Sequence, residues 1–214
     1  MTHLTKEAAH RLIDDLRSIA PKRPLSYGEA IQVARRQAAR LRRHLQCDRE
    51  DINLIWLWEQ QAVPVRFAPS ADLEESGLTT DQINGRIEIL INQEEPTERQ
   101  RFTLSHELKH VIDFYDADLI YTRLGTGDNE VRGLMIEAIA NEFAAHLLMP
   151  TILVKRLWAK TPNLKLAAAV FNVSLEAMQK RLTRLGLIGE PKPRPQGYFR
   201  RADLRLPAEQ LRAA

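Results

Sequence analysis

Residues 102–110 read FTLSHELKH, a short segment that places two histidines and a glutamate on neighbouring positions. In an α-helix, residues four apart project from the same face, so His106 and His110 can reach one cation with two neutral imidazoles. Glu107, offset by one residue, can address a water on that cation without binding the ion itself. This is the HExxH arrangement of zinc peptidases, in which the glutamate takes the proton of the attacking water.

The spacing leaves the third ligand open, because a catalytic zinc takes three protein ligands and keeps one position for water. Asp116 lies six residues past His110, but the bend that this spacing requires favours glycine at 113, where this chain has aspartate. Asp113 itself is better suited to orient a histidine from outside the ligand set. The preferred third ligand is Glu137, with Asn141 one helical turn further on as its outer neighbour.

The segment EAIANEFAAHLLMP, residues 137–150, supports this preference because its small residues allow a second helix to approach closely. These residues are Ala138, Ala140, Ala144 and Ala145. His146 follows Glu137 by nine positions, roughly 900° around a helix, and therefore projects from the opposite face. We expect His146 to be structural or exposed, and Glu142 to point too far from Glu137 to share its ion.

Hydrophobic periodicity elsewhere predicts a mostly helical chain with two short strands. Helices are expected over residues 5–19, 27–45, 51–60, 96–115 and 130–148, and further helices to about 184. Strands are expected over residues 63–69 and 86–92. Ser26 and Glu29 have the spacing of a capping box, and Pro64 indicates an edge strand because proline cannot donate to a ladder.

The charge of the chain is unevenly distributed. The 214 residues carry a net charge of +3, which divides into +5 over residues 1–50, −11 over 51–150 and +9 over 151–214. An acidic middle can hold a cation or receive a basic partner, and a basic end can meet nucleic acid or an acidic partner.

The single cysteine, Cys47, excludes an internal disulfide, and no apolar run approaches the roughly 20 residues of a membrane helix. We expect a cytoplasmic protein that does not contact a membrane.

The basic end contains two predicted helices around a tight turn, residues 164–185, which is the pattern of a helix-turn-helix. On one interpretation Lys180, Arg181 and Arg184 contact DNA or a protein partner. The favoured alternative is a helical subdomain that packs against the core or docks the substrate. It is favoured because the second helix lacks a polar set suited to reading bases.

Three separated blocks, RFTLSHELKH, EAIANEFAAHLLMP and LAAAVFNVSLEAMQKRLTRLGLI, occur in this order and together resemble the ImmA/IrrE family of bacterial and phage metallopeptidases. The resemblance covers about residues 50–190. It implies His106, His110 and Glu137 as metal ligands and Glu107 as the catalytic acid and base. One departure is Lys109, a long cation within the motif where many relatives have a small residue.

The resemblance also implies an α+β fold: a mostly helical, zincin-like peptidase core with a small antiparallel sheet, followed by a helix-turn-helix-like subdomain. The expected domains are an N-terminal helical extension, the core, the subdomain and a basic Pro/Arg-rich tail, over residues 1–48, 49–150, 151–190 and 191–214. For the oxyanion of the transition state, Tyr115, Tyr121 and Arg123 are candidate donors.

The expected function is that of a zinc-dependent endopeptidase, with Mn²⁺ as the alternative metal. Members of the family act on helix-turn-helix repressors, so the expected substrate or partner is a repressor or antitoxin of a phage, toxin–antitoxin or stress-response system. The alternative function is a regulator that binds protein or DNA, retains the metal site and does not cleave. Glu107 favours chemistry, because binding zinc does not require it whereas activating water does.

Overall fold

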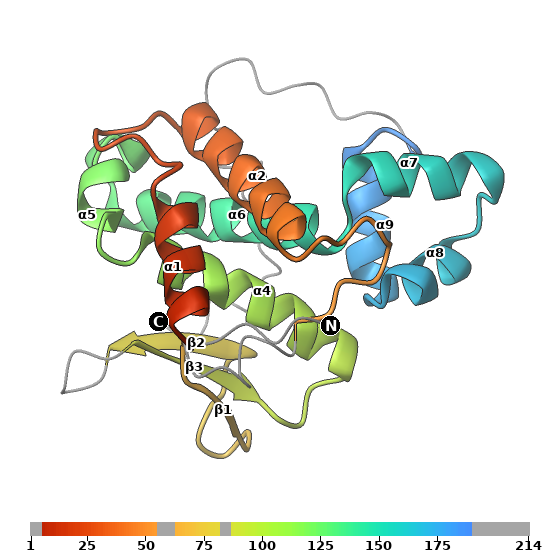
Figure 1. The fold of residues 1–214 in the computed structure, drawn as a ribbon, viewed down its shortest axis with the longest axis horizontal. Coiled ribbons are helices and arrows are strands. Elements are labelled where there is room, and N and C mark those ends of the chain that lie inside the picture. Colours follow the sequence, from red (N-terminus) through yellow and green to blue (C-terminus); the bar gives the residue numbers. More distant parts are fainter. Residues whose placement is uncertain (1–5, 55–62, 82–86, 190–214) are drawn as a thin grey trace.

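The computed structural model describes residues 6–54, 63–81 and 87–189 of the chain. Within these residues a small sheet lies beneath a layer of long helices, and three shorter helices form one end of the molecule (Figure 1). The helices are α1 (Lys6–Arg17), α2 (Tyr27–His44), α4 (Thr97–Asp113), α5 (Ala117–Ile120), the 3₁₀ helix η1 (Leu124–Gly127), α6 (Asn129–Leu148), α7 (Thr151–Lys160), α8 (Leu164–Phe171) and α9 (Leu175–Arg184). The strands are β1 (Val65–Ala68), β2 (Gly77–Asp81) and β3 (Ile87–Asn92). No helix in this described part of the chain is both long and apolar enough to cross a bilayer.

The mostly helical α+β fold is confirmed, but the expectation of an antiparallel sheet is wrong, because the sheet is mixed. Its strand order among the described residues is β1-β3-β2. The outer strand β1 runs parallel to β3, with Val65 opposite Ile89. The other outer strand, β2, runs antiparallel to β3, with Thr79 opposite Ile89. Strand β2 was not expected from the sequence, although the β-branched pair in GLTTD suits a strand.

Two predictions of helices from the sequence have different outcomes, the capping box before α2 and the helix over residues 51–60. The capping box before α2 is present: Ser26 Oγ accepts from the backbone N–H of Glu29 at 3.4 Å, and Glu29 Oε2 accepts from the backbone N–H of Ser26 at 2.8 Å. The helix expected over residues 51–60 is not present at 51–54, and its remaining residues lie outside the described ranges. The turn expected at Asn84-Gly85 lies outside them as well.

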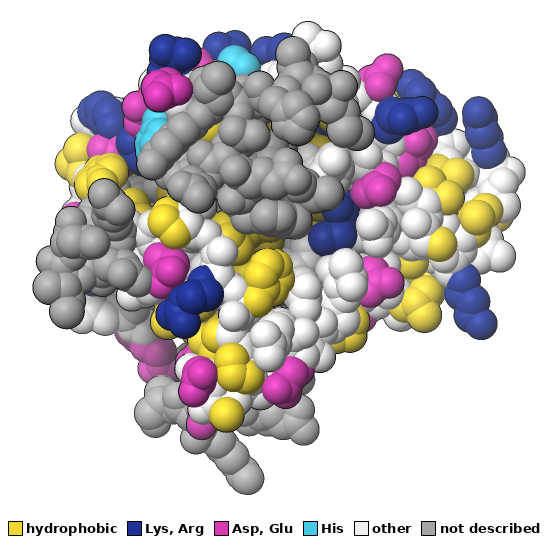
Figure 2. All heavy atoms as spheres, turned by 60° about the horizontal axis from the view of Figure 1, so that its bottom comes forward, with side chains coloured by type: hydrophobic (Ala, Val, Ile, Leu, Met, Phe, Trp, Pro, Cys, Tyr) yellow, Lys and Arg dark blue, Asp and Glu magenta, His cyan; other side chains and the backbone are white. Residues whose placement is uncertain are grey.

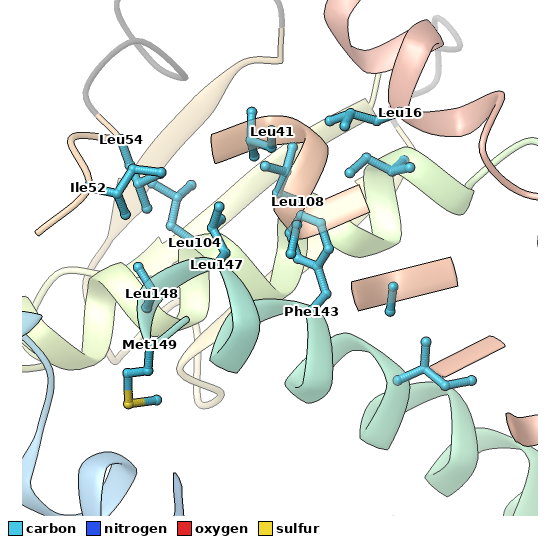
Figure 3. Packing of buried hydrophobic residues seen from close by; sticks show 14 of the residues in the cluster. Leu16, Leu41, Ile52, Leu54, Leu104, Leu108, Phe143, Leu147, Leu148 and Met149 are labelled. Carbon is cyan, nitrogen blue, oxygen red and sulfur yellow. The ribbon is translucent and has the colours of Figure 1, made fainter. Parts of the chain in front are cut away.

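The core forms where α4 and α6 lie against each other beneath α2 (Figure 3). Leu104 and Leu108 come from α4, and Phe143 and Leu147 come from α6. In both helices the two residues are four positions apart, so each helix presents one apolar stripe to the other. Leu41 of α2 packs into the same cluster (Figure 3).

The N-terminal helices hold both central helices from outside. Arg17 Nε of α1 donates to the carbonyl of Ile112 at 3.0 Å, near the C-terminal end of α4. Arg42 Nη1 of α2 donates to the carbonyl of Leu147 at 2.8 Å, in the last turn of α6. Cations at helix C-termini satisfy carbonyls that lack intrahelical partners and interact favourably with the helix dipole. The described part of the expected N-terminal extension therefore stabilises the C-terminal ends of α4 and α6.

A buried carboxylate joins three helices. The Glu142 side chain on α6 is fully buried and accepts from Arg35 Nε of α2 at 2.7 Å. It also pairs with Arg184 Nη1 of α9 at 2.5 Å and with His146 Nδ1 at 3.1 Å. Burial raises the pKa of Glu142, but His146, Arg184 and Arg35 outweigh burial and lower this pKa to about 2. Ionised Glu142 thus links α2, α6 and α9.

The Glu142 cluster predicts a pH dependence of stability. Because the folded-state pKa of about 2 is below the ordinary value of 4.5, the stabilisation is complete above pH 4.5 and is lost as the pH falls towards 2. Thermal melting of the wild type and of Glu142→Gln should therefore show a difference that shrinks over this range. A difference that stays constant down to pH 2 would show that ionisation of Glu142 does not contribute.

Candidate metal centre

Helices α4 and α6 bring together His106, His110 and Glu137. His106 Nε2 lies 3.0 Å from Glu137 Oε2, and His110 Nε2 lies 3.4 Å from Glu137 Oε1. The two Nε2 atoms are 3.1 Å apart. Among the described residues this is the one group of three His, Cys, Asp or Glu side chains whose ligand atoms converge.

These three side chains fit a tetrahedral zinc ion. Zinc binds imidazole nitrogen and carboxylate oxygen at about 2.0–2.2 Å, so two ligand atoms at a tetrahedral centre are about 3.3 Å apart. The two Nε2 atoms, 3.1 Å apart, are close to that value, and they lie 3.0 and 3.4 Å from different oxygens of the Glu137 carboxylate. Two imidazoles and one carboxylate also form the donor set of many catalytic zinc sites, in which the fourth position holds water.

Electrostatics favour a charged carboxylate at this centre. Burial raises the pKa of Glu137, but its contacts with His106 and His110 outweigh burial and hold that pKa well below its usual range. Desolvation lowers the pKa of His106, and the contact with Glu137 outweighs it, so the His106 pKa is raised. Metal ligation requires a neutral imidazole, so metal binding competes with the proton that Glu137 stabilises on His106.

Asn141 fixes the orientation of one imidazole. Its Oδ1 lies 3.1 Å from His106 Nδ1. Because an amide oxygen can only accept, Nδ1 carries the proton and donates, which leaves Nε2 free as a ligand. The sequence placed Asn141 beside Glu137, whereas the structure shows the hydrogen bond to His106.

Glu107 has a hydrogen-bond partner, Thr79, that was not predicted from the sequence. Thr79 Oγ1 on β2 lies 2.7 Å from Glu107 Oε2. The Glu107 residue is only 6% exposed, so its carboxylate needs a donor to compensate for lost hydration. No spacing rule could have found Thr79, because the contact joins a strand to a helix 28 residues further along the chain.

The expected role of Asp113 is corrected. Its carboxylate accepts from Lys109 and Tyr121, and all three residues are buried, so it does not orient a histidine. Burial lowers the pKa of Lys109, while the ion pair with Asp113 opposes this change. Lys109, the long cation within the motif, is therefore paired with Asp113 inside the protein. The Tyr121 hydroxyl also donates to Asp113, so it is not available as an oxyanion donor.

The other acidic and aromatic candidates are occupied elsewhere. Asp116 forms an ion pair with Lys22, away from the histidines. Tyr115 is 66% exposed and lies under the Arg17 guanidinium, 4.9 Å from its ring centre. His146 pairs with Glu142 instead of the metal-site residues, as the helical spacing predicts.

The three α9 residues considered for DNA or partner contact, Lys180, Arg181 and Arg184, all have partners within the protein. Arg181 is 3% exposed and donates to the Met149 carbonyl at 3.0 Å, and Arg184 pairs with buried Glu142. Lys180 is exposed but pairs with Glu176 at 2.6 Å. Figure 2 shows acidic and apolar side chains among the Lys and Arg side chains at the α7–α9 end, on the right. Two of the three predicted contact residues therefore connect α9 to the core.

A pair of substitutions on α6 tests the ligand assignment. Glu137→Ala should greatly lower the zinc content of the purified protein, because it removes the only carboxylate that reaches both histidines among the described residues. His146→Ala on the same helix should leave the zinc content unchanged. Elemental analysis after dialysis measures both. Full zinc content in Glu137→Ala, or loss of zinc in His146→Ala alone, would assign the third ligand to another residue.

Comparison with known proteins adds three findings. The sequence profile of the IrrE N-terminal-like domain matches residues 58–183. The radiation response metalloprotease IrrE of Deinococcus deserti is 41% identical over 66 residues, which are 31% of this chain and 24% of that protein. The protein of the same name from Deinococcus radiodurans is 44% identical over 62 residues, which are 29% of this chain and 19% of that protein.

A solved structure described as a Mycobacterium tuberculosis transcriptional regulator is similar with a TM-score of 0.49 and 15% identity. That similarity covers 80% of this chain and 51% of the other. The chain thus spans a quarter or less of the curated relatives and about half of this structure.

Proposed function

Because the chain belongs to the IrrE N-terminal-like family of metalloproteases, we propose that it is a zinc-dependent endopeptidase that cleaves a repressor-type regulatory protein. The observation that carries the proposal is the convergence of His106, His110 and Glu137, with Glu107 beside them. Binding a metal ion does not require Glu107, whereas activating a water does, so its presence favours catalysis over binding alone.

The roles of the residues follow from their positions. A bound Zn²⁺ supplies Lewis-acid chemistry, polarising the scissile carbonyl and making the attacking water more acidic. His106, His110 and Glu137 hold the ion, and Asn141 keeps His106 in the tautomer that binds it. Glu107 accepts the proton of the water at its carboxylate and then delivers it to the leaving amine.

Charge supports a basic substrate. Residues 51–150, which carry the whole site, have a net charge of −11. Acidic segments attract cationic partners and raise their rate of encounter. Helix-turn-helix repressors present basic surfaces to the phosphates of DNA, so a repressor or antitoxin of this class would complement the acidic segment that carries the site.

The direct test is incubation of the zinc-loaded protein with purified helix-turn-helix repressors, including any that is encoded beside its gene. Mass spectrometry should find a small number of cleaved bonds, none after treatment with a chelator, and cleavage again after Zn²⁺ or Mn²⁺ is restored. A repressor that binds the zinc-loaded protein and stays intact would favour a non-cleaving regulator. A repressor that neither binds nor is cleaved would contradict the proposed substrate class.

A further inference from the structure

Strand β2 approaches α4 unusually closely. A Cβ atom on Gly77 would lie 2.3 Å from Thr103 Cγ2 of α4 and 3.0 Å from the Leu90 carbonyl oxygen. Side-chain carbons do not approach atoms to 2.3 Å, so a larger residue at this position would force Thr103 or β2 to shift. Gly77 thereby allows the strand to lie close to the helix that carries the HELKH motif.

The same strand and helix meet again two residues further along β2. Gly77 and Thr79 lie on one face of the strand, and Thr103 and Glu107 lie on one face of the helix. Two strand residues advance about 6.7 Å, and four helix residues advance about 6.0 Å, so the two repeats nearly coincide. The contact of Gly77 with Thr103 therefore places Thr79 opposite Glu107.

The hydroxyl of Thr79 has a single proton to donate. Its Oγ1 lies 2.7 Å from Glu107 Oε2 and 3.3 Å from the Glu107 backbone carbonyl. The shorter contact to a charged acceptor is the stronger one, so the proton goes to the carboxylate. This hydrogen bond is accepted by Oε2 of Glu107 and does not involve Oε1.

We propose that Thr79 is a positioning residue for the peptidase reaction: its hydroxyl holds Oε2 of Glu107 so that Oε1 faces the water to be activated. This inference rests on the proposed endopeptidase function. Among the described residues, Thr79 forms its hydrogen bonds with Glu107 and none with His106, His110 or Glu137. It acts by limiting the orientations of the base, which a carboxylate on a long side chain would otherwise sample.

Substitutions at Thr79 test this role in the zinc-loaded protein, with a helix-turn-helix repressor that the wild type cleaves as substrate. Thr79→Val keeps the shape and removes the hydroxyl, and it should lower kcat about 10- to 100-fold with little change in KM or zinc content. Thr79→Ser restores the hydroxyl and should recover most of the rate. Thr80→Val, on the opposite face of the same strand, is the matched control and should behave as the wild type.

Glu107→Gln in the same assay separates the two proposals. If Glu107→Gln is inactive while Thr79→Val keeps the wild-type kcat, the positioning role is wrong and the endopeptidase proposal stands. If the wild type leaves the repressor intact, the proposed function itself fails. If Glu107→Gln cleaves at the wild-type rate, Glu107 is not the base and the positioning role of Thr79 fails with it, while the endopeptidase proposal stands. A Thr79→Ser variant as slow as Thr79→Val, or a loss of zinc or melting temperature in Thr79→Val that accounts for its lower rate, would also overturn the positioning role.

Discussion

Replacing Glu107 with glutamine is expected to lower the rate of peptide hydrolysis by about 10²- to 10⁴-fold and to leave the zinc content unchanged. Glutamine keeps the size of the side chain and can still contact Thr79, but it cannot accept a proton from water. The ion is held by His106, His110 and Glu137, so the site should still load. Steady-state cleavage of the repressor and elemental analysis of the same samples measure the two properties.

The matched control for this substitution is Glu98→Gln, which makes the same chemical change in the first turn of the same helix. It should retain the wild-type rate, because Glu98 lies about two helical turns from His106 and about three from His110. Hydrolysis by Glu107→Gln at the rate of Glu98→Gln would remove Glu107 from the mechanism. Loss of zinc from Glu107→Gln would instead assign Glu107 a part in metal binding.

Replacing Glu142 with glutamine is expected to destabilise the protein by about 3 kcal/mol, the lower end of the range for breaking a buried ion pair. The lower end applies because Arg35 and Arg184 are 38% and 49% exposed and can turn towards water. Arg181 is 3% exposed and cannot turn towards water, and the substitution removes the negative charge of Glu142 near it. For a chain of this size the melting temperature should fall by about 6–12 °C.

Glu176→Gln is the control, because Glu176 forms an exposed pair with Lys180 on α9 and its loss should cost at most about 0.5 kcal/mol. Chemical denaturation of both variants at neutral pH gives the comparison. Equal stabilities for Glu142→Gln and Glu176→Gln would mean that the buried cluster does not hold α2, α6 and α9 together.

The residues of the candidate centre were predictable because each one follows a helical repeat. His106 and His110 are four apart, and Glu137 and Asn141 are four apart, so one face of each helix could be derived from spacing alone. That the two faces meet depends on the packing of α4 against α6, which the small residues of α6 and the family resemblance of the three sequence blocks both indicated.

Contacts between distant elements were not predictable in the same way. Thr79 reaches Glu107 only because β2 pairs with β3 and Gly77 allows it to approach α4. Arg181 and Arg184 look identical to DNA-binding arginines in the sequence, and only the fold shows that their partners are the Met149 carbonyl and Glu142. Charge patterns give the sign of a surface and do not give the partner.

The helices that precede the family match support the two helices that carry the metal-site residues. The match begins at residue 58, yet Arg17 and Arg42 cap the ends of α4 and α6, and Arg35 pairs with Glu142. The two helices that carry the metal-site residues are thus held from both ends of the described chain, by α1 and α2 on one side and by α9 on the other.

The central claim, that His106, His110 and Glu137 bind one cation, is tested most directly by anomalous diffraction from crystals of the zinc-loaded protein, measured on both sides of the zinc absorption edge. We expect one strong anomalous peak about 2.0–2.2 Å from His106 Nε2, His110 Nε2 and a Glu137 carboxylate oxygen. A zinc-loaded crystal with no peak between these side chains, or with its peak at other residues, would contradict the claim.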